Sequence, residues 1–208
     1  MKSSRTRTVV LATALAVPLA LGGIGPTALA EGVPASSPSP SGSAGPFGPE
    51  CAKLPNGGKG GDMARQKVAD AVAQSPQLTE LASALRQAGL TGPLNDAKEI
   101  TLFAPDNEAF QDLTAAEREA LFNNPDQLKR VLNYHVVEKK ITRDDLPNGS
   151  FTTREGSKLT TSGSGDRFEV NNEADIECGG VRVANATIEV IDEILMPPPA
   201  SPSPSPSP

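Results

Sequence analysis

The chain of 208 residues carries 25 Asp and Glu against 19 Lys and Arg, which gives a net charge of −6 at pH 7. This acidic balance argues against nucleic acid as a partner, because binding to phosphates depends on a positive surface. One histidine and two cysteines are too few for a zinc site, and the sequence indicates no other metal or cofactor.

Residues 1–30 have the anatomy of a signal peptide. Three basic residues precede an apolar stretch from Val9 to Ile24, and Ala28-Leu29-Ala30 follows, which predicts cleavage after Ala30. A retained anchor helix is the weaker alternative, since the stretch is short and contains Pro18.

The mature chain is expected to leave the cell. No cysteine directly follows the apolar stretch to take a lipid, and no later segment is apolar enough to span a membrane. Removal of residues 1–30 takes away three basic and no acidic residues, so 16 basic and 25 acidic residues remain, a net charge of −9. We therefore expect a secreted protein that is extracellular or associated with the cell wall.

Two segments of low complexity flank a single predicted domain. Residues 31–58 are rich in Pro, Ser and Gly and are interpreted as a linker, and residues 197–208 as a disordered Pro/Ser-rich tail. Residues 59–196 are enough for one hydrophobic core and too few for two ordinary domains. We expect this domain to be a monomer.

The first half of the domain has helical periodicity. Val68, Ala71 and Val72 share one face, and the spacing of Leu81 and Leu85 predicts a second helix. Further along the chain, the spacing from Thr114 to Glu117 is that of a capping box. Another helix is predicted to begin at Pro125.

The second half of the domain has the alternating pattern of strands. Apolar and polar residues alternate at residues 168–170, 176–178 and 181–183, before an apolar run at 187–191. Gly179-Gly180 is interpreted as one of several turns between these strands. Helices followed by short strands predict an α+β domain.

Three segments, in order, resemble signature segments of the fasciclin domain family. They are residues 101–110 (TLFAPDNEAF), 132–137 (LNYHVV) and 185–198 (NATIEVIDEILMPP). The resemblance implies a fasciclin fold, a wedge of two β-sheets with a cluster of helices from the N-terminal half at one edge. The segments around Cys51 and Cys178 are similar to the small secreted single-domain fasciclin antigens of mycobacteria and related actinobacterial proteins.

Cys51 and Cys178 are expected to form one disulfide, because an exported protein meets an oxidising environment. A free thiol or an intermolecular pair is the alternative. The resemblance also implies the Cys51–Cys178 bridge.

Candidate site residues come mainly from the resemblance. The family's Tyr-His segment has been implicated in receptor contact, which makes Tyr134 and His135 weak binding candidates. From the residues themselves, His135 is interpreted as a histidine hydrogen-bonded within the core, since apolar residues flank it, and contact with a partner is the alternative. Asn185-Ala186-Thr187 fits a glycosylation acceptor, but it lies in the closing signature segment and is interpreted as structural.

The sequence does not indicate an enzyme. It has no Gly-x-Ser-x-Gly motif, and a Ser-His-Asp site would have to use His135. The acidic residues Asp144, Asp145, Glu173, Asp175 and Glu177 lack the spacing of an EF-hand.

We therefore expect an extracellular adhesion or interaction module that binds a cell-surface or matrix protein or a polysaccharide. The alternative is a carrier of a small apolar ligand in the cell envelope, with its pocket between the helices and a sheet.

Overall fold

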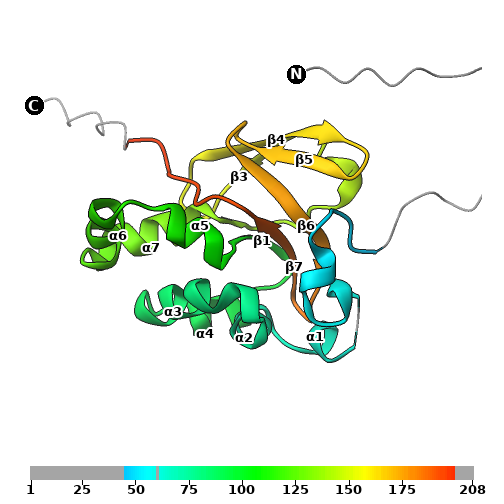
Figure 1. Ribbon diagram of the computed structural model, residues 1–208, viewed down its shortest axis with the longest axis horizontal. Helices are drawn as coiled ribbons and strands as arrows, with labels where there is room; N and C mark the ends of the chain where they lie inside the picture. The colour runs from blue at the N-terminus through cyan, green and yellow to red at the C-terminus, as the bar shows by residue number, and fades with distance from the viewer. Residues whose placement is uncertain (1–44, 60, 200–208) are drawn as a thin grey trace, which may run out of the picture. The chain divides into compact units, whose positions relative to one another are not determined.

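The structure is a computed structural model that describes residues 45–59 and 61–199 (Figure 1). The predicted signal peptide, the first part of the predicted linker and most of the predicted tail lie outside these residues. Within them, helices come mainly from the first half of the domain and strands from the second half. The predicted α+β class is therefore confirmed.

The helices begin where the sequence supplies caps. Asp106 accepts a hydrogen bond from the backbone N–H of Ala109, and Thr114 and Glu117 form the predicted capping box. The α-helices are α1 (Asp62–Arg65), α2 (Val68–Gln74), α3 (Thr79–Gln87), α4 (Thr91–Asp96), α5 (Asn107–Asp112), α6 (Ala115–Phe122) and α7 (Pro125–Tyr134). Short 3-10 helices lie at Cys51–Lys53, Pro55–Gly58, Pro76–Leu78 and Arg143–Asp145.

Seven strands form a mixed sheet in the order β2-β1-β7-β6-β5-β4-β3. The strands are β1 (Ile100–Pro105), β2 (Val136–Val137), β3 (Asn148–Thr152), β4 (Lys158–Ser164), β5 (Arg167–Val170), β6 (Ala174–Arg182) and β7 (Ala186–Ile191). The β1–β7 pair is parallel and the other pairs are antiparallel. An isolated bridge between Val137 and Thr153 joins the two ends of the strand order, so the sheet is nearly closed.

Strand β7 separates two hydrophobic clusters. Ile188 and Val190 pack in the cluster that contains the apolar faces of α2 and α3, whereas Ile191 belongs to a cluster with Phe103 and Phe168. Every residue of β7 is buried, as expected for a strand covered on both faces. Figure 1 shows α2, α3 and α4 on one side of β1 and β7, with β3, β4 and β5 on the other.

Residues 45–58, which we call the strap, correct part of the predicted linker. Phe47 is only 5% exposed, and its backbone N–H and C=O pair with Gly179 of β6 at 3.0 and 2.8 Å. Cys51 forms the expected disulfide with Cys178. Composition alone predicted a linker because the strap contains few apolar residues, but these include Phe47 and Leu54, and both are buried.

Gly179 and Gly180 lie inside β6, not in the predicted turn. The pairing of β6 with β7 changes register between Cys178 and Val181, which is a β-bulge. A Cβ atom at Gly179 would collide with the Phe47 ring and with a carboxylate oxygen of Glu189. Glycine is therefore required there by the close approach of the strap.

Candidate functional site

A groove of about 550 Å³ lies between the loop that joins α4 to β1 and the hairpin that joins β6 to β7. Residues 95–100 line one side and residues 182–187 the other, with Lys67 and Lys140 completing the wall. We call this feature the hairpin groove. It is open to solvent, and its lining combines apolar surface with six charged residues, which can supply hydrogen bonds and charge to a ligand.

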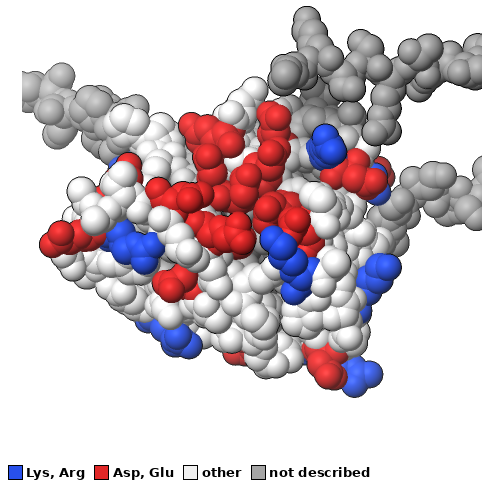
Figure 2. All heavy atoms as spheres, viewed as in Figure 1, with Lys and Arg blue, Asp and Glu red and all other residues white. Residues whose placement is uncertain are grey.

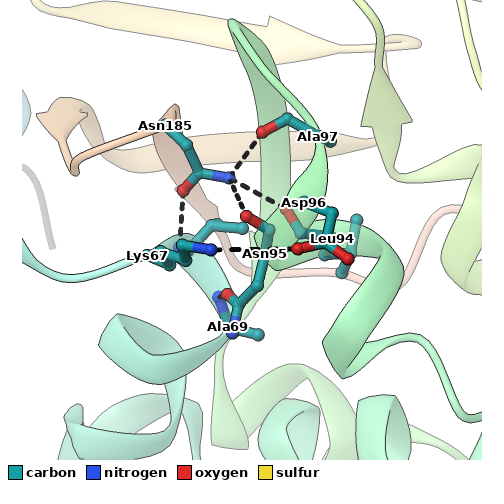
Figure 3. A network of polar contacts seen from close by, with 8 residues as sticks. Lys67, Ala69, Leu94, Asn95, Asp96, Ala97 and Asn185 are labelled. Carbon is teal, nitrogen blue, oxygen red and sulfur yellow. Dashed lines mark hydrogen bonds and ion pairs between the residues drawn. The ribbon is translucent and has the colours of Figure 1, made fainter.

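Asn185 holds the two sides of the groove together (Figure 3). Its Oδ1 accepts a hydrogen bond from the backbone N–H of Val68 at 2.9 Å. Its Nδ2 donates to the carbonyl oxygens of Leu94 and Ala97, both at 2.9 Å. The side chain thus links the β6–β7 hairpin to the start of α2 and the end of α4.

Asn95 completes the same network. The N-cap residue of α2, Lys67, makes no side-chain capping bond, so the first amides of this helix need other acceptors. Asn185 Oδ1 accepts from the N–H of Val68, and Asn95 Oδ1 accepts from the N–H of Ala69 at 3.0 Å. Because the Asn185 amide is fully engaged in these bonds, the predicted structural role of the Asn185-Ala186-Thr187 segment has a direct physical basis.

Cations dominate the charges around the hairpin groove. Lys67 lies 3.8 Å from Asp96, a weak exposed ion pair. Lys98, Lys140 and Arg182 make no ion pair within residues 45–59 and 61–199, although all three line the groove. Glu99, the second acid of the groove, has a backbone φ of 53°, an unusual conformation for a residue other than glycine.

Tyr134 and His135 do not reach the surface. Tyr134 is 3% exposed, and its hydroxyl donates to the carbonyl of Lys158 and accepts from the amide of Asn171. His135 is completely buried; its Nδ1 donates to the carbonyl of Val131 at 2.8 Å, and its Nε2 accepts from the N–H of Leu195 at 3.1 Å. These positions argue against the predicted contact with a partner, because neither side chain can be touched while the domain is folded.

Burial also fixes the charge state of His135. Loss of hydration lowers the pKa of His135 from 6.5 to about 4, and the hydrogen bond to Val131 offsets only part of this effect. The imidazole is therefore neutral at physiological pH. It joins the end of α7 to the segment after β7 and has no role in binding that the geometry supports.

A second charged feature is an acidic face (Figure 2). Burial, and then the neighbouring Asp106, raise the pKa of Glu177 to about 7. The pKa of Asp192 is raised by burial and by the negative charge of Asp175. Within the described part of the chain, no group of three or more His, Cys, Asp or Glu residues is arranged to hold a metal ion.

The chain belongs to the fasciclin domain family, whose model matches residues 76–197. It is 39% identical over 141 residues to the immunogenic protein MPB70 of Mycobacterium bovis, covering 65% of this chain and 72% of that protein. The cell surface glycolipoprotein MPB83 of the same species is 40% identical over 141 residues, covering 65% of this chain and 63% of that protein.

The similarity extends beyond mycobacteria. The protein sll1483 of Synechocystis is 32% identical over 133 residues, covering 63% of this chain and 73% of that protein. In structure, the chain matches a FAS1 domain pair from the insect cell adhesion molecule Fasciclin I with a TM-score of 0.54 and 19% identity, covering 64% of this chain and 51% of that chain. This likeness confirms the predicted fasciclin fold.

The relatives bear the names of antigens and of surface or adhesion proteins. Among the helices of the described residues, none has the length and hydropathy needed to cross a bilayer.

The hairpin groove was not predicted from the sequence. Its walls are brought together only by the fold, and the spacing of Lys98, Lys140 and Arg182 along the chain gives no sign that they meet.

Proposed function

We propose that this protein is a secreted interaction module that binds a polymer or surface protein outside the cell through the hairpin groove, and that it is not an enzyme. The observation that carries this proposal is the groove itself, an open concave site of about 550 Å³ whose two walls are fixed by the bonds of Asn185. Rigid walls reduce the entropy lost on binding. Family membership supports the extracellular setting, as do the names of the relatives.

The alternative of an apolar-ligand carrier receives less support. Its pocket was expected between the helices and the sheet, but that space is filled by packed side chains such as Val72, Leu81 and Ile188, all fully buried. The groove does contain apolar surface, but it is open to solvent and six charged residues line it, so it would not enclose an apolar ligand. Catalysis by His135 would require a base that substrate can reach, and His135 is enclosed.

The test is retention of purified residues 31–208 on isolated cell walls of the producing cells and on extracellular proteins. Ala184→Trp fills the groove without changing charge, since Ala184 is exposed on the groove wall. We expect this variant to bind at least about tenfold more weakly, as is common when a central contact is lost. Ala184→Ser is the matched control and should bind like the unsubstituted protein.

Two results would contradict the proposal. One is that residues 31–208 are retained on none of these materials. The other is that Ala184→Trp, shown to be folded by its unfolding transition, is retained as well as Ala184→Ser.

A further inference from the structure

A second cavity, of about 170 Å³, lies beside the hairpin groove. The two share Lys140, Arg182 and Thr187, so these residues can contact a ligand in either cavity. The second cavity adds Arg143 and the edge of the strap at Phe47. We call the two adjacent cavities together the path.

The charge of this path is opposite to that of the chain. Five cations line it, Lys67, Lys98, Lys140, Arg143 and Arg182, against the three acids Asp96, Glu99 and Asp144. The chain as a whole carries a net charge of −6. Concave sites concentrate such a local excess of positive charge, because field lines are focused between walls of low dielectric constant.

Three of these cations are available to a ligand. Lys67 pairs with Asp96 at 3.8 Å, and Arg143 pairs with Asp166 at 2.5 Å and donates to the carbonyl of Gly165. Within the described residues, Lys98, Lys140 and Arg182 have no such partner. Lys140 and Arg182 line both cavities, which makes them the central charges of the path.

The surface lacks what a protein partner usually needs. Stable protein interfaces are anchored by exposed aromatic and large apolar side chains. In the described part of the chain the one large hydrophobic residue that is exposed is Met196, and it does not line either cavity. A hydroxyl-rich ligand, by contrast, would find ammonium and guanidinium donors and the hydroxyl of Thr187 along the path.

We propose that the path formed by the hairpin groove and the second cavity binds an anionic polysaccharide, with Lys98, Lys140 and Arg182 contacting its acidic groups. This inference rests on the proposed function and specifies the chemistry of the partner. Carboxylate and phosphate groups would be held in the same way, by charge and hydrogen bonds from these side chains. The test uses one polymer that carries carboxylates and one that carries phosphates, so it shows which of these groups is bound.

The experiment measures equilibrium binding of residues 31–208 to polygalacturonate, which carries carboxylates, and to phosphomannan, which carries phosphates. The matched neutral polymers are methyl-esterified polygalacturonate and mannan. We expect binding to at least one acidic polymer, little binding to its neutral counterpart, and weakening when NaCl is raised from about 50 to about 500 mM, because salt screens these contacts.

The decisive variant is the double substitution Lys140→Gln and Arg182→Gln, which should weaken binding by at least about tenfold. Its control, Lys129→Gln with Lys158→Gln, removes two exposed charges that do not line the path. We expect the control to bind like the unsubstituted protein. A general effect of net charge would weaken both variants equally and would overturn the assignment to this path.

Other results also overturn the inference: binding to neither acidic polymer, or equal binding to the neutral ones. Its failure can be told from failure of the proposed function. If Ala184→Trp abolishes retention on cell walls while Lys140→Gln with Arg182→Gln does not, the groove binds a partner that is not anionic. If neither affects retention, the groove is not the binding site.

Discussion

Glu189 is the residue whose chemistry is most altered by the fold. It is completely buried in β7; its Oε2 accepts a hydrogen bond from the N–H of Gly180 at 3.1 Å, and its Oε1 has no partner. Burial raises the pKa of Glu189 from 4.5 to about 8, and the bond from Gly180 opposes this shift. The side chain is therefore a neutral carboxylic acid at physiological pH.

Glu189 and His135 give the folding stability opposite dependences on pH. A raised carboxyl pKa means that the native state holds a proton that the unfolded state releases, so stability falls as pH rises from 4.5 to about 8. The lowered pKa of His135 makes stability rise between about pH 4 and 6.5. Above pH 6.5 the contribution of His135 is nearly complete and the loss due to Glu189 dominates.

We therefore predict that the free energy of unfolding decreases by about 1 kcal/mol between pH 6.5 and 8, an average slope of roughly half a proton. Glu177, with a pKa raised to about 7, adds a smaller loss in the same direction because it is partly exposed. Urea unfolding at a series of pH values measures this slope.

The variant Glu189→Gln keeps an acceptor for Gly180 and cannot ionise, so it should remove most of the slope. Glu169→Gln, at an exposed position of β5, is the control and should leave the slope unchanged. A flat profile in the unsubstituted protein, or an unchanged slope in Glu189→Gln, would refute this assignment.

At the scale of elements, the strap is the segment whose position depends most on one covalent bond. The Cys51–Cys178 disulfide closes a separation of 127 residues and holds the strap beside β6, where Phe47 covers Gly179 and Glu189. Phe47 also packs edge-on against Phe168 with ring centroids 5.4 Å apart. The strap thus closes one end of the cluster that contains Phe168 and Ile191.

We predict that replacing both cysteines by serine destabilises the domain by about 4 kcal/mol, the size expected for a long loop in the chain-entropy model. Urea unfolding at a fixed pH gives this difference. Limited proteolysis should then cut within residues 45–58 before it cuts elsewhere in the domain. If the variant unfolds at the same urea concentration as the unsubstituted protein, the strap is held by its non-covalent contacts and this account of it is wrong.

The elements differ in how well the sequence predicts them. The capping box at Thr114 and Glu117 and the helical spacing around Leu81 are local signals, and both were confirmed. The strap was not foreseen, because its fit depends on the contact of Phe47 with Gly179, far along the chain. The apolar residues around His135 indicated a histidine hydrogen-bonded within the core, and it is buried in this way, but its partner Leu195 is far along the chain and no local pattern identifies it.

At the scale of the whole molecule, charge is divided between two features. Asp and Glu side chains gather on one face (Figure 2). The charges of Glu177, Asp175 and Asp192 act on one another, whereas the cations of the hairpin groove and the second cavity line the path. The acidic face favours solubility and repels anionic surfaces, so an anionic partner would be directed to the path. This division explains how an acidic protein could bind an acidic polymer.

The separation of acidic and basic side chains on the surface could not be predicted from composition. The net charge of −6 predicts no anionic partner, and for nucleic acid we retain that prediction. Only the fold brings Lys98 and Lys140 beside Arg182 and separates them from most of the acids. Asn185 also joins parts of the molecule that are distant in sequence, since its hydrogen bonds to Val68 and Leu94 span 117 and 91 positions.

The most direct test of the central claim is amide hydrogen exchange of residues 31–208, free and bound to cell walls of the producing cells. We predict slower exchange on binding at residues 95–100 and 182–187, the two walls of the hairpin groove, because a bound polymer would shield and stiffen them. Slower exchange confined to the acidic face around Asp175 and Asp192, with the groove unchanged, would contradict the claim.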